Sequence, residues 1–374
     1  MIRPLFLKEL DLRSFRNWTA ARVTFSPGQN AIVGPNGAGK TTLLEAIYLL
    51  ALGRSFRSHQ DEALAEWGSS SWRVAGVLED GRGAREMEVR WDRARGKRIR
   101  VGGRGIARLS DLVGQMPVVL FTPDELHLVK GPPQLRRSWL DRVLGQGRPS
   151  YVEMRSRMRE ALLQRNAALR KGGRGGDPWT LLWVKAAAPV AAARHAFFQE
   201  YVPLFQGAAA QMLGTGDVDL FWLPGGFKNA KPAHAFPPDE EGWRQLLQAK
   251  IEEQRGEEER RMATLVGPHR DEILFTFRGK PARHFASQGE QRSLVLALKA
   301  AEILYLREKL QRHPLALLDD IFSELDVSHR ERLQVILADE GQAFFTTTDP
   351  QWVPGRRETR WIWVSGASIR TEGR

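Results

Sequence analysis

The chain has 374 residues, enough for two compact units that each bury a core. Lys and Arg number 56 against 44 Asp and Glu, and the net charge of +12 favours a polyanionic partner such as nucleic acid, although solvated basic faces give the same composition. There is no cysteine, which excludes disulfides and thiolate metal sites. No apolar run is long enough to span a bilayer and the N-terminus does not resemble a signal peptide, so we expect a cytoplasmic protein with no membrane partner.

Short strand-like runs and turns occupy the first part of the chain. A hairpin is expected over residues 5–12 and 21–25, and an apolar run at 31–33 ends in a glycine-rich loop before a helix-like stretch at 41–52. The loop comprises Gly34, Pro35, Asn36, Gly37, Ala38, Gly39, Lys40 and Thr41, and Thr42 follows in the helix. A strand, such a loop and a helix in this order form the phosphate-loop motif, which predicts binding of a nucleoside triphosphate.

Each part of this loop has a role in binding phosphate. Glycines permit backbone angles that let successive amides converge on one anion, and the helix N-terminus adds partial positive charge. We expect Lys40 to reach the terminal phosphates and Thr41 to offer its hydroxyl to Mg²⁺. A glycine-rich turn with a chance lysine would not explain the flanking strand and helix.

Beyond the loop, the sequence pattern changes from one typical of strands to one typical of helices, and then back to strands. Antiparallel strands are expected at 72–78, 85–91 and 98–101, and an apolar strand at 116–121. Helices are expected at 136–144, 151–169 and 240–262, and 179–212 is expected to be one long helix or two helices broken at Pro189 or Pro203. A short strand at 218–222 lies among these helices.

The last part returns to alternating strands and helices. Strands are expected at 272–277, 314–318 and 343–347, helices at 288–310 and 328–337, and two strand-like runs at the end. We therefore expect an α/β fold with a mixed sheet. Residues 1–125 and 266–374 would form one ATPase lobe, and residues 126–265 would form an inserted helical lobe.

Two adjacent carboxylates follow the apolar strand at 314–318. The carboxyl ends of parallel strands face the nucleotide in phosphate-loop proteins, so a Mg²⁺-binding aspartate is expected there. We assign Asp319 to the metal and Asp320 to orienting or deprotonating the attacking water. A solvated Asp-Asp turn is the other interpretation, which the upstream phosphate loop disfavours.

A second anion site is suggested at the start of the helix at 288–310. Ser287 is placed as its N-cap, and Glu290 three residues later would complete a capping box. A purely structural cap is one interpretation. A serine, Gly289 and a helix N-terminus also form a site for a phosphate brought from elsewhere.

The order of these motifs resembles the ATP-binding-cassette (ABC) ATPases of chromosome maintenance, such as SMC proteins and Rad50, and more narrowly the RecF family of recombination mediators. The blocks that carry the resemblance to RecF span nearly the whole chain: Phe15-Arg16-Asn17, residues 53–57, 131–141, 267–271, 286–291 and 317–326. The resemblance implies an ABC-type head with a helical second lobe and no long coiled coil. It also implies ATP-dependent homodimerisation and slow, DNA-stimulated hydrolysis that works as a switch.

The resemblance further implies roles for individual residues and partners. Ser287 and Gly289 would contact the γ-phosphate held by the other subunit, and Asp326 lies in the position of the D-loop. Arg16 lies where relatives contact the nucleotide, although a simple surface turn explains that segment equally well. Thr348 stands where a switch histidine is usual, and Asp320 stands where most relatives have glutamate. The protein would act at gapped or junction DNA, with RecR and RecO, to promote loading of RecA.

Basic clusters provide candidate DNA contacts, although each one could equally be a solvated face. They comprise Arg54, Arg57, Arg93, Arg95, Lys97, Arg98, Arg100 and Arg104. No base-reading module is apparent, so contacts to phosphate without sequence specificity are expected. Three other functions were weighed: an SMC-like or Rad50-like ATPase of another role, a transporter ATPase subunit, and a small-molecule kinase. The basic charge and the RecF-like blocks disfavour a transporter subunit, and a kinase leaves Ser287 without a role.

Overall fold

The computed structural model describes residues 5–81, 83–172, 178–227, 236–338, 341–353, 359–366 and 368–372. Two compact units divide the chain: residues 1–125 with 302–374 form unit 1, and residues 126–301 form unit 2. The first boundary lies where it is expected from the sequence. The second boundary differs, because residues 266–301, expected in the ATPase lobe, belong to unit 2.

Strand pairing and helix packing explain the position of this second boundary. Strand β10 (Glu272–Phe277) pairs antiparallel along its whole length with β9 (Val218–Leu223), which lies in the inserted segment. In addition, the Tyr201 hydroxyl donates a hydrogen bond to the Leu298 carbonyl (2.5 Å). Both interactions attach residues 266–301 to the insert, although the order of the sequence motifs predicted this segment in the ATPase lobe.

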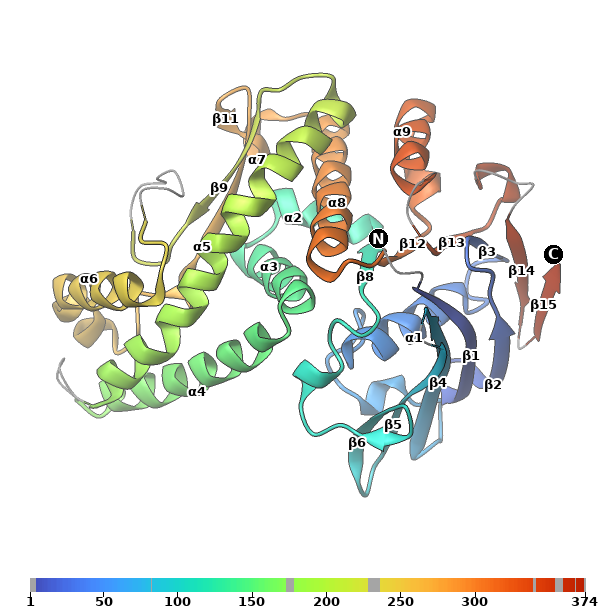
Figure 1. The fold of residues 1–374 in the computed structure, drawn as a ribbon, viewed down its shortest axis with the longest axis horizontal. Coiled ribbons are helices and arrows are strands. Elements are labelled where there is room, and N and C mark those ends of the chain that lie inside the picture. The colour runs from blue at the N-terminus through green and yellow to red at the C-terminus, as the bar shows by residue number, and fades with distance from the viewer. Residues whose placement is uncertain are drawn as a thin grey trace. The chain divides into compact units, whose positions relative to one another are not determined.

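Unit 1 contains an antiparallel sheet of six strands in the order β2-β1-β4-β5-β6-β7 (Figure 1). Its strands are β1 (Leu5–Phe15), β2 (Trp18–Thr24), β4 (Ser71–Asp80), β5 (Gly83–Asp92), β6 (Gly96–Val101) and β7 (Arg104–Gly105). β1 and β2 form the expected hairpin, and β4, β5 and β6 follow as the expected antiparallel series.

The second sheet of unit 1 is mixed and has the order β15-β14-β3-β13-β12-β8. Its strands are β3 (Gln29–Val33), β8 (Val118–Phe121), β12 (Leu315–Asp319), β13 (Ala343–Thr347), β14 (Arg360–Ser365) and β15 (Ser368–Glu372). All neighbouring pairs are parallel except β14 with β15. The five parallel strands therefore end at one edge, where the phosphate loop and the aspartate pair follow β3 and β12.

Helix α1 (Lys40–Leu52) lies between the two sheets of unit 1, against β4 and β5 on one side and β8, β12 and β13 on the other (Figure 1). All of its residues except Thr41 are buried, which is why the sequence is apolar on every face of the helix rather than along one stripe. Helix α9 (Val327–Ala338) follows β12. The core of unit 1 thus holds the start of α1, and with it the phosphate loop, in a fixed position.

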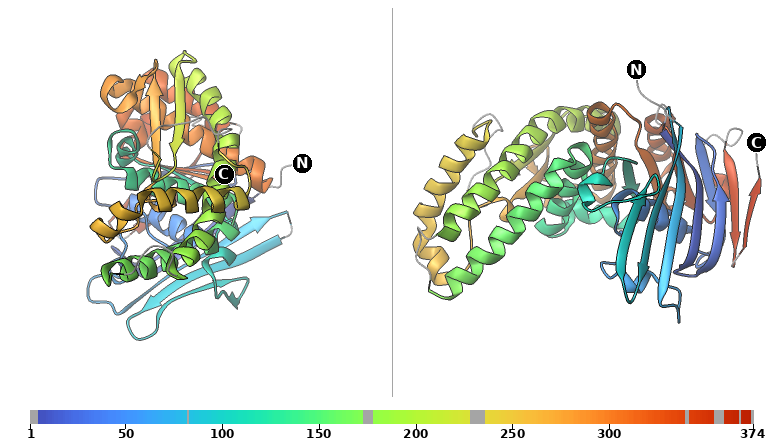
Figure 2. Two further views of the ribbon diagram at one scale, coloured as in Figure 1. Left: turned by 90° about the vertical axis from the view of Figure 1, so that its left-hand side faces the viewer. Right: turned by 60° about the horizontal axis from the view of Figure 1, so that its bottom comes forward.

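Unit 2 is mainly helical. Its helices are α2 (His127–Lys130), α3 (Pro133–Gly147), α4 (Ser150–Arg170), α5 (Pro178–Leu213), α6 (Glu240–Arg261) and α7 (Ala282–Phe285), and α8 (Gln288–Leu310) begins in it. β9, β10 and β11 (Lys280–Pro281) form a small antiparallel sheet. α4 packs against α5 as a helical hairpin (Figures 1 and 2). Within the described ranges there is no long coiled coil, and no helix is long and apolar enough to cross a membrane.

Two of the RecF-like blocks meet inside unit 2. The Arg194 guanidinium donates to Asp141 (2.7 Å) and to Asp271 (2.7 Å), which belong to the blocks at 131–141 and 267–271. Asp271 also accepts from the Trp222 indole and the Gly225 amide (both 2.8 Å). All of these side chains are buried or nearly buried, so this pair of blocks forms a structural network.

Candidate nucleotide-binding site

The phosphate loop leaves β3 and enters α1 through two glycines with left-handed backbone angles, Gly37 (φ 78°) and Gly39 (φ 102°). Gly34 is needed for a different reason, since a Cβ there would lie 2.1 Å from the Val364 carbonyl oxygen of β14. The Lys40 ammonium donates to the carbonyls of Gly34 (2.8 Å) and Pro35 (3.0 Å), which closes the loop into a ring. The expected loop is therefore present as a tight turn built on glycines and closed around the Lys40 ammonium.

Three charged groups converge at the carboxyl edge of the mixed sheet. Burial lowers the pKa of Lys40, and the carboxylates of Asp320 and Asp319 oppose that change. The sequence assigned these residues to one site from positions far apart in the chain. The structure brings them close enough to influence one another's charge.

Two predicted metal ligands are in direct contact. The Thr41 hydroxyl donates a hydrogen bond to Asp319 Oδ1 (2.8 Å). A hydroxyl and a carboxylate are oxygen donors of the kind that Mg²⁺ prefers, and this ion usually takes only one or two protein ligands beside phosphate and water. Thr41 and Asp319 are therefore the residues that could hold Mg²⁺ beside phosphate oxygens and water.

Thr346, in the neighbouring strand β13, holds both aspartates and was missed by the sequence analysis. Its hydroxyl donates to Asp319 Oδ1 (2.7 Å) and accepts from the backbone N–H of Asp320 (2.9 Å). Asp319 lies opposite Thr346 in the parallel register of β12 and β13. Only this pairing of distant segments reveals the role of Thr346, because threonine at a strand end is otherwise unremarkable.

The aspartate predicted to position water has an unusual backbone conformation. Asp320 has φ 50°, the left-handed region that aspartate tolerates better than most residues. Its carbonyl accepts from the Ser323 hydroxyl (2.7 Å), which fixes the turn after β12. Thr348, predicted at the switch position, is exposed immediately after β13, at the same edge of the sheet.

Arg16, predicted to contact nucleotide, forms a two-pronged ion pair with Glu45, a fully buried residue of α1. Its Nη2 and Nε atoms lie 2.6 and 3.0 Å from the two carboxylate oxygens. Ser55 also donates to Glu45, and Arg57 lies 3.5 Å from it. The blocks at 15–17 and 53–57 therefore meet at Glu45, a residue that sequence reasoning did not single out. The guanidinium groups of Arg16 and Arg57 already have a protein partner.

The segment at 286–291 in unit 2 contains the expected capping box. The Ser287 N–H donates to the Glu290 carboxylate (2.7 Å) and the Glu290 N–H donates to the Ser287 hydroxyl (3.3 Å). The backbone bond from Ser287 lowers the pKa of Glu290. Ser287 and Gly289 are exposed, and a hydroxyl that accepts one bond retains its own proton to donate. Capping and phosphate binding by Ser287 are therefore compatible.

Asp326, expected in the D-loop, caps α9. Hydrogen bonds from the His329 backbone N–H (2.9 Å), the His329 ring and the Ser328 hydroxyl (2.9 Å) lower the pKa of its carboxyl well below the usual range. The side chain is exposed and ionised at neutral pH, so it is a fixed negative charge at the start of that helix.

Some of the cationic residues predicted to contact DNA form ion pairs within the protein, and the others, which we call open, do not. Arg57, Arg93, Lys97 and Arg98 form ion pairs with Glu45, Glu62, Asp61 (2.9 Å) and Asp92 (3.6 Å), respectively. By contrast, Arg54, Arg95, Arg100 and Arg104 are exposed and form no ion pair with any carboxylate in the described part of the chain. The open group provides the stronger candidates.

Comparison with known proteins shows which family this chain resembles. The sequence matches the family described as RecF/RecN/SMC N terminal domain over residues 6–359. The DNA replication and repair protein RecF of Moorella thermoacetica is 40% identical over 358 residues, covering 94% of this chain and 92% of that protein. Its counterpart from Gloeobacter violaceus is 36% identical over 362 residues, covering 93% and 95%.

Two solved structures have a similar fold. One, described as the recombination mediator protein RecF-ATP in the RecFOR pathway, has a TM-score of 0.88 at 25% identity and covers 100% of this chain and 99% of that chain. An Smc head bound to the C-winged helix domain of ScpA has a TM-score of 0.55 at 15% identity, covering 98% and 97%. The second likeness is one of fold alone.

The two sheets around a phosphate-loop helix, joined to a helical lobe, define an ATPase head of the ABC type found in RecF and SMC proteins, as the sequence predicted. The sequence identities extend over more than nine-tenths of the chain, and they narrow the assignment from this class of ATPases to one family. The chain belongs to the RecF family of DNA replication and repair proteins.

Proposed function

We propose that this protein is an ATP-dependent DNA clamp that dimerises when it binds ATP and acts in DNA replication and recombinational repair. The observation that carries the proposal is the 2.8 Å contact between Thr41 of the phosphate loop and Asp319 of β12, beside the buried Lys40. This contact joins the phosphate-binding segment to the metal-binding segment. A glycine-rich turn without function would not need it.

Binding of the triphosphate follows from the loop. The amides of residues 37–41 and the N-terminus of α1 would hold the phosphates, and the Lys40 ammonium would exchange its two loop carbonyls for phosphate oxygens. Thr41 and Asp319 would hold Mg²⁺, which when bound neutralises charge on the phosphate oxygens. Asp319 is already oriented for this by Thr346.

Hydrolysis would depend on Asp320. The left-handed turn and the bond from its N–H to Thr346 fix the backbone of Asp320, and its carboxylate would orient the attacking water. Aspartate is one methylene shorter than glutamate, so we expect slow turnover that DNA stimulates. Thr348, exposed at the same sheet edge, is the candidate for sensing the terminal phosphate.

Dimerisation would complete the site from a second copy. The exposed Ser287 hydroxyl, the Gly289 amide and the N-terminus of α8 would contact the γ-phosphate held by the other subunit. Charge-assisted hydrogen bonds are worth about 1.5–3 kcal/mol each, so two such contacts give ATP a strong preference for the dimer. Hydrolysis removes the shared phosphate and so loosens the dimer.

The biological setting is proposed by analogy with the relatives. The curated relatives are named for DNA replication and repair, and the similar ATP-bound structure is described within the RecFOR pathway. We therefore propose cytoplasmic action at gapped or junction DNA, with RecR and RecO as partners and RecA loading as the outcome. Arg54 and Arg100, two of the open arginines of unit 1, would supply charge for binding to DNA without sequence specificity.

Light scattering of the purified chain with and without ATP and Mg²⁺ tests this proposal. The wild-type protein should shift from monomer to dimer with ATP, and Ser287→Arg should remain monomeric because a bulky cation replaces the hydroxyl. Ser70→Arg, at an exposed position in a loop of unit 1, is the control with the same charge change and should dimerise normally. A wild-type protein that binds ATP yet stays monomeric, with and without DNA, would contradict the proposal.

A further inference from the structure

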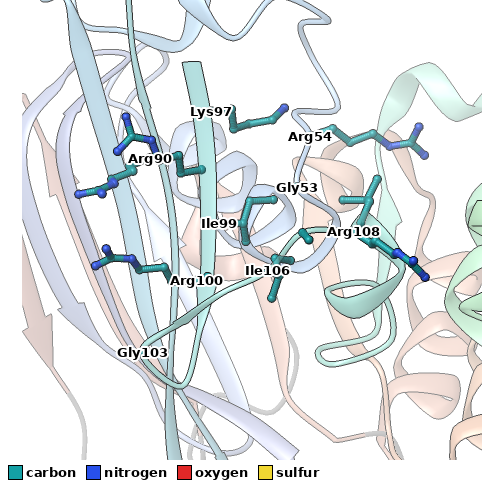
Figure 3. Close-up of a pocket in the computed structure, with 13 residues that line it drawn as sticks. Gly53, Arg54, Arg90, Lys97, Ile99, Arg100, Gly103, Ile106 and Arg108 are labelled. Carbon is teal, nitrogen blue, oxygen red and sulfur yellow. The ribbon is translucent and has the colours of Figure 1, made fainter. Parts of the chain in front are cut away.

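A hollow with a volume of about 670 Å³ lies around the open side of strand β6 in unit 1 (Figure 3). Six cationic side chains line it: Arg54, Arg90, Lys97, Arg98, Arg100 and Arg108. The lining includes no carboxylate and no aromatic ring. The charged residues around the hollow therefore all carry the same sign, and they come from the end of α1, strands β5 and β6, and the segment after β7.

The fold leaves this side of β6 open. β6 pairs with β5 along its whole length, but on its other edge β7 pairs only with Arg100 and Val101, and the Ile106 N–H donates to the Ile99 carbonyl (3.1 Å). Gly53, in the left-handed conformation (φ 66°), ends α1 and packs so closely against Leu109 that a Cβ would lie 2.8 Å from it. Ile99, Ile106 and Leu109 supply apolar surface beneath the cations.

The cations lie on both sides of the strand. In Figure 3, Lys97 and Ile99 point from β6 toward Gly53 and Arg54, whereas Arg90 and Arg100 point from the opposite side of the ribbon. Arg90 lies directly across from Arg98 in the β5–β6 pair. Like charges directly opposite in a sheet destabilise it, and a bound anion would offset that cost.

Part of this charge is not neutralised by the protein. Lys97 pairs with Asp61 at 2.9 Å, and Arg98 and Arg90 form longer ion pairs with Asp92 at 3.6 Å and Glu88 at 3.9 Å. Glu88, which lies across from Arg100, is engaged by Arg73 at 2.6 Å. Within the described ranges, Arg54 and Arg100 form no ion pair, and they lie on opposite sides of the strand.

We infer that this hollow binds the phosphate backbone of duplex DNA, with Arg54 and Arg100 as its main contacts. The inference rests on the proposed DNA-binding function and assigns that function to a particular surface of unit 1. Arg98 and Arg100 are two residues apart on β6, about 6.8 Å along the strand, so their side chains leave the same side of the sheet and can both face one stretch of phosphate backbone.

The chemistry of the lining favours the backbone of a duplex over single-stranded bases. Proteins that hold single strands without sequence preference stack bases on aromatic rings, and the hollow has none. Arginines contact phosphates without reading bases. The simpler alternative is that these cations only protect the sheet edge from pairing with another chain, and the experiment below separates the two roles.

The test measures binding of a fluorescently labelled, gapped duplex as a function of salt, with ATP and Mg²⁺ present. Each lost phosphate contact lowers the slope of log K against log[salt] by about 0.9, so the double variant Arg54→Ala/Arg100→Ala should lose about 1.8 in slope. At about 0.15 M salt this corresponds to about 30-fold weaker binding. Arg54→Lys/Arg100→Lys should keep most of the slope because it keeps the charge.

The control is Arg95→Ala/Arg104→Ala. These residues lie close in sequence to β6, are exposed, form no ion pair with described carboxylates and lie outside the hollow. The control removes the same charge and should keep the wild-type slope. Equal losses in both double variants, or none in either, would overturn the inference and leave edge protection as the role. If the wild-type protein bound no DNA with ATP, the proposed function itself would fail.

Discussion

Thr346→Val tests whether the hydroxyl of β13 positions the metal-binding aspartate. The substitution keeps the shape of the side chain and removes the bond to Asp319 (2.7 Å) and the acceptor for the Asp320 N–H (2.9 Å). A hydrogen bond to a charged group is worth about 1.5–3 kcal/mol. That range corresponds to roughly 10- to 150-fold in affinity, close to the 10- to 100-fold typical of residues that orient metal ligands.

The assay is ATP hydrolysis at saturating ATP with Mg²⁺ titrated. We expect the Mg²⁺ midpoint to rise at least tenfold in Thr346→Val, with a loss in unfolding free energy of about 1–3 kcal/mol from the stranded N–H. Thr347→Val is the matched control, since Thr347 is also buried and bonded, but to Asp349 (3.1 Å) rather than to either aspartate. Equal Mg²⁺ midpoints in the two variants would refute the positioning role of Thr346.

Three further changes test other parts of the account. Glu45→Gln should lower the unfolding free energy by on the order of 3 kcal/mol in denaturant titration, because it breaks the buried pair with Arg16, whereas Glu9→Gln, in a surface pair with Arg22, should cost under about 1 kcal/mol. Burial lowers the pKa of His269 to about 4, so the folded state favours the neutral ring. The part of the unfolding free energy that depends on the neutral His269 ring should be fully present above about pH 6.5 and lost as the pH falls toward 4. His269→Gln should remove that part of the pH dependence. The Asp320→Asn variant should bind ATP and dimerise, but its two subunits should separate slowly because hydrolysis is slowed. An unchanged hydrolysis rate would show that Asp320 does not position the water.

The order of elements was predictable because the signals are local. The phosphate loop, the apolar strand before Asp319 and the capping box at Ser287 each depend on a few consecutive residues, and the structure has each in the expected conformation. The long helix α5 was left open between one helix and two because proline removes a backbone donor. Pro189 and Pro203 are tolerated within it because the carbonyls they free belong to Lys185 and Gln199, which are exposed to water.

Contacts between distant segments could not be predicted in this way. Thr346 reaches Asp319 only because β13 pairs with β12 in parallel register, and Glu45 gathers Arg16, Ser55 and Arg57 only because α1 is buried between two sheets. The second domain boundary was misplaced for the same reason. Motif order placed residues 266–301 with the nucleotide site, but strand pairing placed them in unit 2.

A mixing experiment tests the shared nucleotide site most directly. Lys40→Met and Ser287→Arg should each fail to dimerise and hydrolyse ATP when alone. In a mixture, a dimer of one copy of each has one intact site, formed by the phosphate loop of the Ser287→Arg copy and the serine of the Lys40→Met copy. We predict that mixing restores ATP hydrolysis, up to about half the wild-type rate per dimer if the two sites act independently. A mixture as inactive as its components, with both variants folded, would contradict a site completed by a second copy.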